Sequence, residues 1–300
     1  MKFESGFIKN IRVHQFDELI AHCASIDPEF NIFVDGGAGL GETSNQMLSA
    51  CNFAVEKILA FEPNPANVAA FRITNTNKVE LIPSALGSEN GVGTFQITST
   101  TNNFIDNQYH VAGTSFVGKL VNDTTFDLNK TNVKVVKLSD ILRDRGLNKI
   151  DFLKLDLQGG ELDSLLGLEG YLETVKVMWM EYSGQPGLLK FLQKSGFTLF
   201  DTEYLFVGKP NDLIAELFDL TRFGRNSIGK QIFFGYRKHL WADYESILDF
   251  MKRRRRVIQT DMIVINNKYL ESLRGFVDLN VSILSEDTPD IINGIKSLPL

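Results

Sequence analysis

A glycine-rich segment directly after a short apolar run is the feature that most constrains this chain. Residues 31–34 have the composition of a buried parallel strand, and Asp35-Gly36-Gly37-Ala38-Gly39-Leu40-Gly41 follows them. Glycines let the backbone turn sharply and approach a ligand without a Cβ in the way. A helical pattern comes next, with Thr43 or Ser44 as its expected cap. This order predicts a cofactor loop at the carboxyl end of a parallel strand.

The spacing of the glycines bears on which cofactor this loop binds. A dinucleotide fingerprint G-x-G-x-x-G that starts at Gly37 needs its third glycine at position 42, where this chain has Glu42. A carboxylate beside a pyrophosphate is unfavourable, whereas S-adenosylmethionine carries a sulfonium and an amino-acid tail but no phosphate. The spacing therefore favours S-adenosylmethionine, with an NAD-dependent oxidoreductase as an alternative.

A second acidic residue supports the same site. Residues 57–61 form another apolar run, which ends at Glu62 and Pro63. A carboxylate at the tip of the second strand can accept hydrogen bonds from both ribose hydroxyls, and Pro63 ends the strand there. We therefore predict that Glu62 contacts the ribose of the cofactor.

Alternating strand and helix patterns continue along the chain and predict an α/β, doubly wound sheet. A helix is expected at 15–26, within an N-terminal helical cap of residues 1–30, and residues 31–300 are expected to form one domain. Two insertions interrupt it: a loop at 99–131, either an acceptor-binding lid or a surface excursion, and a helical segment at 209–258. The other expected helices are 64–75, 139–145 with Ser139 as cap, 162–168 and 187–195, and the other expected strands are 79–83, 91–98, 133–136, 150–156, 175–180, 197–207 and 261–265.

Composition narrows the class of protein. The chain has 300 residues, of which 43% are hydrophobic and 23% charged, and its net charge is −6, which argues against bulk binding of nucleic acid. Cys23 and Cys51 form no C-x-x-C pair, so neither a disulfide framework nor a zinc site is indicated. The sequence shows no signal peptide and no apolar stretch of membrane-spanning length, so a cytoplasmic location is the expectation.

Three further segments make the sequence specific: PSALGSENGVGTFQIT from position 83, VKVVKLSDIL from 133 and IDFLKLDLQGGELDSLLGLEGYL from 150. Together with the glycine loop and the Glu-Pro pair, and in the same order, they resemble the FkbM-type methyltransferase family from about residue 33 to about 207. The resemblance implies a class I methyltransferase fold, Rossmann-like, with a seven-stranded, mostly parallel sheet, a final antiparallel strand and helices on both faces. It also implies S-adenosylmethionine as cofactor and methyl transfer to an oxygen of a sugar, glycan or natural product.

The resemblance assigns a cofactor pocket, with Asp156 near the transferred methyl group. Gln158 stands where family members commonly have glutamate, so the site loses a charge and gains a hydrogen-bond donor. A magnesium ion on Asp156 is therefore an alternative that we do not favour. The residues expected to bind the cofactor are Asp35, Gly37, Ala38, Gly39, Gly41, Thr43, Glu62, Pro63, Ser84, Ala85, Leu86, Asp156 and Gln158.

Methyl transfer to a hydroxyl needs a base for the hydroxyl proton. The candidates are Asp156, His110 and Glu181, and Asp156 is preferred because its strand tip faces the methyl group.

The acceptor is expected to be a small molecule or a glycan, with association to glycan-biosynthesis enzymes as a further expectation. Tyr109 and Tyr182 are candidates for stacking on a sugar ring. Arg253 and Arg254, in the basic run 252–256, either bind a phosphate or acidic glycan or lie on a solvated helix end. An RNA or nucleotide-linked acceptor is the alternative that these arginines suggest, and a non-enzymatic binding module is a third possibility.

Overall fold

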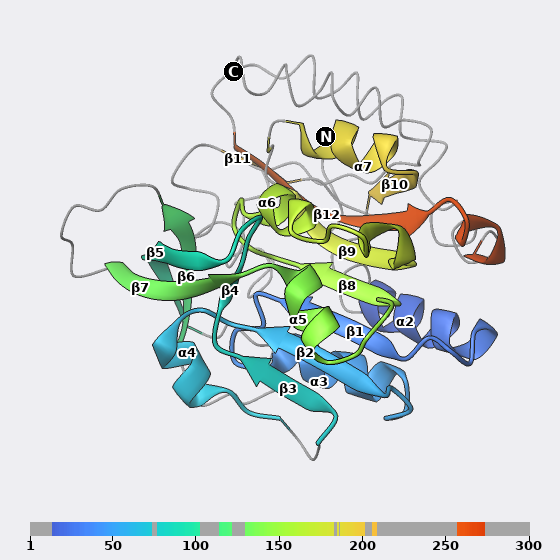
Figure 1. Cartoon of the computed structure of the whole chain (residues 1–300), viewed down its shortest axis with the longest axis horizontal. Helices are drawn as coiled ribbons and strands as arrows, with labels where there is room; N and C mark the ends of the chain where they lie inside the picture. The colour runs from blue at the N-terminus through green and yellow to red at the C-terminus, as the bar shows by residue number, and fades with distance from the viewer. Residues whose placement is uncertain are drawn as a thin grey trace, which may run out of the picture.

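One central sheet organises the molecule (Figure 1). The computed structural model describes residues 14–73, 77–102, 114–121, 130–182, 185, 187–201, 206–208 and 257–273. Seven strands follow one another in the order β10-β12-β9-β8-β1-β2-β3, and β12 is antiparallel to both of its neighbours whereas the other pairs are parallel. The predicted mostly parallel sheet with a final antiparallel strand is thus confirmed. The strands are β1 (Ile32–Gly36), β2 (Lys57–Phe61), β3 (Val79–Ile82), β8 (Phe152–Leu155), β9 (Val177–Tyr182), β10 (Phe197–Asp201) and β12 (Val257–Asn266).

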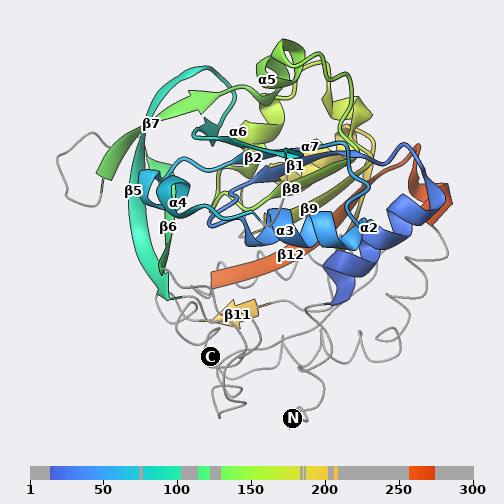
Figure 2. The ribbon, with the colours of Figure 1, turned by 90° about the horizontal axis from the view of Figure 1, so that it is seen from below.

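Helices cover both faces of this sheet (Figure 2). On one face lie α2 (His14–Ile26) and α3 (Glu42–Ala50), and on the other α5 (Leu138–Asp144), α6 (Glu161–Leu166) and α7 (Leu188–Lys194). Successive strand residues alternate between the two: Phe33 packs in the hydrophobic cluster of α2 and α3, and Val34 in that of α5, α6 and α7. Because both faces are covered, the parallel strands are almost continuously apolar.

A second, four-stranded sheet replaces much of the predicted loop at 99–131. Its order is β4-β7-β5-β6, with β4 (Ala85–Leu86), β5 (Gly91–Asn102), β6 (Thr114–Val121) and β7 (Lys130–Val136). The loop prediction was wrong for 99–102, 114–121 and 130–131, because threonines in a polar stretch suit an antiparallel strand as well as a loop. Residues 103–113 and 122–129 lie outside the described part of the chain.

Other elements differ from the prediction in length. Helix α4 (Pro65–Ala70) stops well short of residue 75. Within the expected strand at 197–207 the structure describes β10 and the start of β11 (Phe206–Gly208), and both pair with β12, while 202–205 lie outside the described residues. Because β12 starts at Val257, residues 257 and 258 of the predicted helical insertion are strand, while 209–256 lie outside the described residues. Two short 3-10 helices, Leu172–Thr174 and Leu270–Leu273, complete the described structure.

The predicted helix caps were also wrong. Gly41 is the N-cap of α3, and the Ser44 hydroxyl donates instead to Asp35 Oδ2 at 2.7 Å, because Ser44 is buried against the end of β1. Ser139 lies inside α5, whose N-cap is Lys137. A membrane-crossing helix, sufficiently long and apolar, is not found among the described residues.

Candidate functional site

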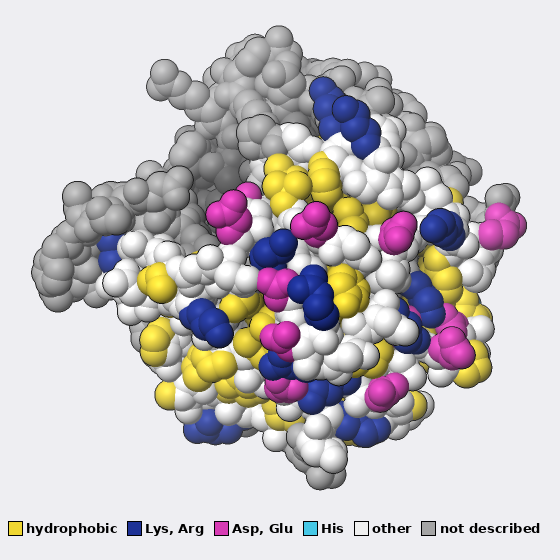
Figure 3. Space-filling model, in the orientation of Figure 1, with side chains coloured by type: hydrophobic (Ala, Val, Ile, Leu, Met, Phe, Trp, Pro, Cys, Tyr) yellow, Lys and Arg dark blue, Asp and Glu magenta, His cyan; other side chains and the backbone are white. Residues whose placement is uncertain are grey.

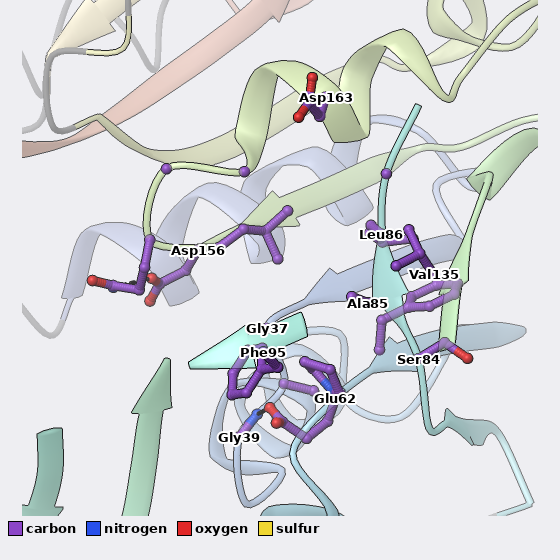
Figure 4. Close-up of a pocket in the computed structure, with 18 of the residues that line it drawn as sticks. Gly37, Gly39, Glu62, Ser84, Ala85, Leu86, Phe95, Val135, Asp156 and Asp163 are labelled. Carbon is purple, nitrogen blue, oxygen red and sulfur yellow. Dashed lines mark hydrogen bonds between the residues drawn. The ribbon is translucent and has the colours of Figure 1, made fainter. Parts of the chain in front are cut away.

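A cavity of about 870 Å³ opens where the carboxyl ends of β1, β2, β3 and β8 meet the second sheet (Figure 4). This is the edge at which open α/β sheets bind ligands, and the volume is in the range of small-molecule sites. Asp35 and Gly41 do not line it. The other residues predicted for the cofactor all do: Gly37, Ala38, Gly39, Thr43, Glu62, Pro63, Ser84, Ala85, Leu86, Asp156 and Gln158.

The glycine loop is held against the ends of two neighbouring strands. The backbone N–H groups of Gly37 and Ala38 both donate to the Phe61 carbonyl, at 3.0 and 2.9 Å. Gly37 has a φ of +77°, and a Cβ at this position would lie 2.1 Å from the Asp156 carbonyl oxygen. Only glycine suits this position, because both the dihedral angle and the close approach of the β8 loop exclude a side chain.

Glu62 faces this loop from the end of β2. It is 4% exposed, its Oε2 accepts the Gly39 N–H at 2.9 Å, and its Oε1 accepts the Asn64 N–H at 2.8 Å and the Asn67 side-chain amide at 3.2 Å. Burial raises the pKa of Glu62, and these donors oppose that rise. Since a carboxylate accepts about four hydrogen bonds, the described donors leave acceptor capacity at the cavity, on Oε2 in particular.

Asp35 lies beneath the cavity floor, so the structure does not support the prediction that it contacts the cofactor directly. It is 0% exposed, and its Oδ1 is 3.3 Å from Lys154 Nζ. Lys154 Nζ also donates to the Gly37 carbonyl at 2.8 Å, and Lys154 itself lines the cavity. Burial favours the neutral amine, but the carboxylates of Asp35, Asp156 and Glu62 raise the pKa of Lys154, so the side chain is an ammonium.

Asp156 stands at the end of β8 and is joined to its surroundings by an amide. Gln158 Nε2 donates to Asp156 Oδ1 at 2.9 Å and to Glu181 Oε2 at 2.7 Å. Gln158 has a φ of +55°, an unusual conformation for a residue other than glycine. Glu161, which is buried in the first turn of α6, accepts the backbone N–H of Leu157 at 2.8 Å and so fixes the loop that carries this group.

Glu181 lies inside β9 rather than at its tip, and it does not line the cavity. It is 3% exposed. Burial raises its pKa well above the usual range, and the nearby carboxylates Asp156, Glu161 and Asp261 raise it further. The surroundings of Glu181 therefore favour its protonated form.

The remaining predicted residues are not brought to the cavity. Tyr182 is 3% exposed in the hydrophobic core, which leaves no ring face for a sugar, so its assignment to the acceptor is corrected. Tyr109, His110, Arg253 and Arg254 lie outside the described residues. Among the residues that the structure does describe, no group of three or more histidine, cysteine, aspartate or glutamate side chains is arranged to hold a metal ion.

The sequence missed several cavity residues besides Lys154. Phe95 of β5 and Val135 of β7 form part of the wall (Figure 4), and Val92 is 75% exposed beside them. These residues lie on segments that the sequence predicted as strands, 91–98 and 133–136, but the pairing that brings these strands to the cavity was not predicted. For Lys154 a signal was present: a lysine in the middle of an apolar strand that is covered on both sides needs a buried partner.

Comparison with known proteins places the chain among methyltransferases. The family model described as methyltransferase FkbM domain matches residues 35–219. The chain is 30% identical to methyltransferase sdnD of Sordaria araneosa over 205 residues, which are 59% of this chain and 78% of that protein. It is 28% identical to methyltransferase 1 of Beauveria bassiana (strain ARSEF 2860) over 196 residues, 57% of this chain and 74% of that protein.

Two solved structures can be compared with it. The methyltransferase FkbM from Methylobacillus flagellatus KT is 16% identical, with a TM-score of 0.33, over 50% of this chain and 32% of that chain. The precorrin-6y C5,15-methyltransferase from Geobacter metallireducens GS-15 is 11% identical, with a TM-score of 0.35, over 86% of this chain and 92% of that chain.

Proposed function

This chain belongs to the FkbM methyltransferase family, whose members depend on S-adenosylmethionine, and from that premise we propose that it methylates a hydroxyl group of a sugar, glycan or other natural product. Its sheet is that of a class I methyltransferase. One observation carries the proposal: a single cavity brings the glycine loop and Glu62 together with Asp156.

The described residues fit S-adenosylmethionine. When bound, this cofactor supplies a methyl group activated by a positively charged sulfur. Glu62 has acceptor capacity at the cavity, and we assign it to the ribose hydroxyls. Gly37 and Gly39 leave the loop backbone open to the ligand, and the acidic lining suits the positive charge.

Asp156 is the best base for the acceptor hydroxyl. It is exposed and lines the cavity, and the Gln158 amide donates to its Oδ1, which orients the carboxylate. Asp156 would then accept the hydroxyl proton as the oxygen is methylated. Glu181 is a poorer candidate, because it is buried, does not line the cavity, and its surroundings favour the protonated form. His110 stays a candidate from the sequence.

The charge of the lining favours a neutral acceptor. The described lining holds the acidic side chains of Glu42, Glu62, Glu89, Asp156 and Asp163 and one basic side chain, that of Lys154. On the face shown in Figure 3, acidic and basic side chains are interspersed, whereas the described cavity lining is mostly acidic. A phosphate would be repelled there, which favours a sugar hydroxyl over an RNA or nucleotide-linked acceptor.

The acceptor contacts expected from the sequence complete the proposal. Tyr109 stays a candidate for stacking on a sugar ring, and Arg253 and Arg254 stay candidates for binding a phosphate or an acidic glycan. Association with glycan-biosynthesis enzymes also stays a prediction.

Isothermal calorimetry with S-adenosylhomocysteine tests the cofactor site. We expect Glu62→Ala to weaken binding by roughly 10- to 100-fold, because hydrogen bonds to a charged group are lost. Glu80→Ala is the matched control. Glu80 lies on β3, outside the cavity lining, where it forms ion pairs with Lys57 and Arg145, so this variant should bind S-adenosylhomocysteine as the wild type does. Equal affinity of Glu62→Ala and wild type would contradict the assignment of Glu62.

The acceptor class needs a second measurement. Transfer of a tritiated methyl group from S-adenosylmethionine to a panel of neutral mono- and oligosaccharides should give a labelled product. Tight binding of S-adenosylhomocysteine without product on the panel would overturn the saccharide assignment. The binding-module alternative would then be the better description.

A further inference from the structure

Lys154 has an ammonium group whose hydrogen-bonding capacity is only partly used. An ammonium donates three hydrogen bonds. Among the described residues, Nζ of Lys154 donates to the Gly37 carbonyl at 2.8 Å and forms an ion pair with Asp35 Oδ1 at 3.3 Å. The side chain is 8% exposed, and Lys154 is one of the residues that line the cavity. One N–H is therefore left for a ligand in the cavity.

The ammonium of Lys154 is held in position by Asp35, which is itself held by Ser44. Asp35 and Lys154 are direct partners in the register of β1 and β8, so their side chains leave the sheet on the same face. The Ser44 hydroxyl holds the other oxygen of Asp35 at 2.7 Å. This chain of contacts, from Ser44 through Asp35 to Lys154, orders a cation directly beneath the glycine loop.

The mostly acidic lining of the cavity makes the Lys154 ammonium the group that can attract a negatively charged part of a ligand. S-adenosylmethionine carries, besides its sulfonium, an amino-acid tail with a carboxylate. In a lining with five acidic side chains, that carboxylate would be repelled unless a cation were next to it, and Lys154 is the one basic side chain of the described lining.

We propose that Lys154 binds the carboxylate of the amino-acid tail of the cofactor, with Asp35 as the positioning residue that holds the ammonium in place. This inference rests on the proposed function, because it assumes that the cavity is the cofactor site. It gives Asp35, which the sequence assigned to direct contact, an indirect role through Lys154.

Two ligands that differ in the tail separate this role from a structural one. S-adenosylhomocysteine has the amino-acid tail, and 5′-methylthioadenosine keeps the adenosine and the thioether but lacks it. Calorimetry should show that Lys154→Met weakens S-adenosylhomocysteine by roughly 10- to 100-fold, as expected for a lost charged hydrogen bond. The affinity for 5′-methylthioadenosine should change by less than about threefold, since that ligand has no carboxylate to lose.

Lys176→Met is the matched control. Lys176 also pairs with buried and half-buried aspartates, Asp151 and Asp27, but at the opposite end of the sheet and outside the cavity lining. Its substitution should leave both affinities as they are.

A variant that leaves Asp35 buried without its cation can fail to fold. The double variant Asp35→Asn/Lys154→Met removes both charges together and should show the same selective loss of S-adenosylhomocysteine. An equal loss of both ligands would overturn the proposal, because Lys154 would then act only on the loop, and so would unchanged binding of both. A wild-type protein that binds neither ligand would instead refute the proposed function itself.

Discussion

The two ends of strand β8 carry aspartates in opposite surroundings. Asp151, just before the strand, is 0% exposed and accepts the backbone N–H groups of Asn31 at 3.0 Å and Ile32 at 2.9 Å. Two ammonium groups approach it, Lys176 at 2.8 Å and Lys149 at 3.0 Å. Here the charge of the carboxylate is balanced entirely within the protein.

Asp156, just after the strand, is exposed to the cavity, and its neighbours include further carboxylates. Its Oδ1 accepts the neutral Gln158 amide, and the nearest cation in the cavity, Lys154, is shared with Asp35 and Glu62. The comparison teaches where function resides in this fold. The balanced end stabilises the sheet, and the end with excess negative charge keeps an attraction for a positively charged ligand.

The largest expected effect comes from Asp156→Asn. The variant keeps the shape and an acceptor for Gln158 but cannot take the hydroxyl proton, so we expect methyl transfer to fall by roughly 10²- to 10⁴-fold. The rate with tritiated S-adenosylmethionine and an acceptor from the saccharide panel measures this. Asp151→Asn is the control at the other end of β8 and should transfer methyl groups at nearly the wild-type rate when folded. A rate loss of the same size in both variants would refute a base at Asp156.

For the free energy of unfolding we expect the opposite order of effects, with Asp151→Asn more harmful than Asp156→Asn. Asp151→Asn removes the charge that Lys176 and Lys149 face, and we expect the free energy of unfolding to fall by about 2–3 kcal/mol. Asp156→Asn should change it by less than about 0.5 kcal/mol, because Asp156 is exposed. Urea denaturation of both variants tests this. A greater loss in Asp156→Asn would mean that the carboxyl end is the structural one.

The parts of this comparison that were predictable from the sequence are local. A strand that runs into glycines, and a strand that stops at Glu62 and Pro63, are signals within a few residues, and both lie at the cavity. The sequence could indicate that Lys154 needs a buried partner, but not that this partner is Asp35, because their contact depends on the register between β1 and β8, more than a hundred residues apart in the chain. Patterns along one strand do not reveal its partner's register.

The second sheet was predicted only in part, as strands at 91–98 and 133–136, while β6 and the end of β5 were assigned to a loop. Strands β5 and β6 pair over eight positions with a register shift between Ile97 and Ser99. Such a bulge interrupts the alternation of side chains on which strand prediction depends. As a result, the sequence assigned residues 99–102 and β6 to a loop. Phe95 and Val135 lie on predicted strands, but their place in the cavity wall depends on how β5, β7 and β4 pair, which the sequence did not reveal.

Gln158→Glu tests the comparison between the two ends of β8, because it adds a negative charge beside Asp156, at the carboxyl end of the strand. Three carboxylates would then converge, because Gln158 now lies between Asp156 and Glu181. In the presence of a chelator we expect the free energy of unfolding to fall by about 1–2 kcal/mol, since two hydrogen bonds to carboxyl groups are lost. Magnesium should restore part of the loss, because carboxylate oxygens are its preferred protein ligands.

Denaturation with and without magnesium chloride measures this effect, and Gln158→Met is the control that removes the same donors without adding a charge. Wild type and Gln158→Met should not respond to magnesium. A response of the wild type would revive the magnesium-dependent alternative. No response of Gln158→Glu would show that the three side chains do not converge on a cation.

The smallest expected effect is on the pH dependence of stability. Glu181, near the carboxyl end of the sheet, and Asp27, near the amino end, should contribute with opposite signs. Burial and the nearby Asp156, Glu161 and Asp261 raise the pKa of Glu181 well above 4.5. Stability from a raised pKa is complete below the unfolded value and is lost as the pH rises through the folded value. Wild-type protein should therefore lose stability as the pH rises from about 4.5, and Glu181→Gln should flatten that slope.

Asp27 supplies the opposite case at the balanced end. Burial raises the pKa of Asp27, but the Lys176 ammonium and the backbone N–H of Glu29 outweigh burial and lower this pKa below 3.8. Stability from a lowered pKa is complete above the unfolded value and is lost as the pH falls through the folded value, so Asp27→Asn should flatten only the acid side of the profile. Urea denaturation across the pH range distinguishes the two variants. If Glu181→Gln instead flattened the acid side, Glu181 would be ionised in the fold, and it would regain its place beside Asp156 as a candidate base.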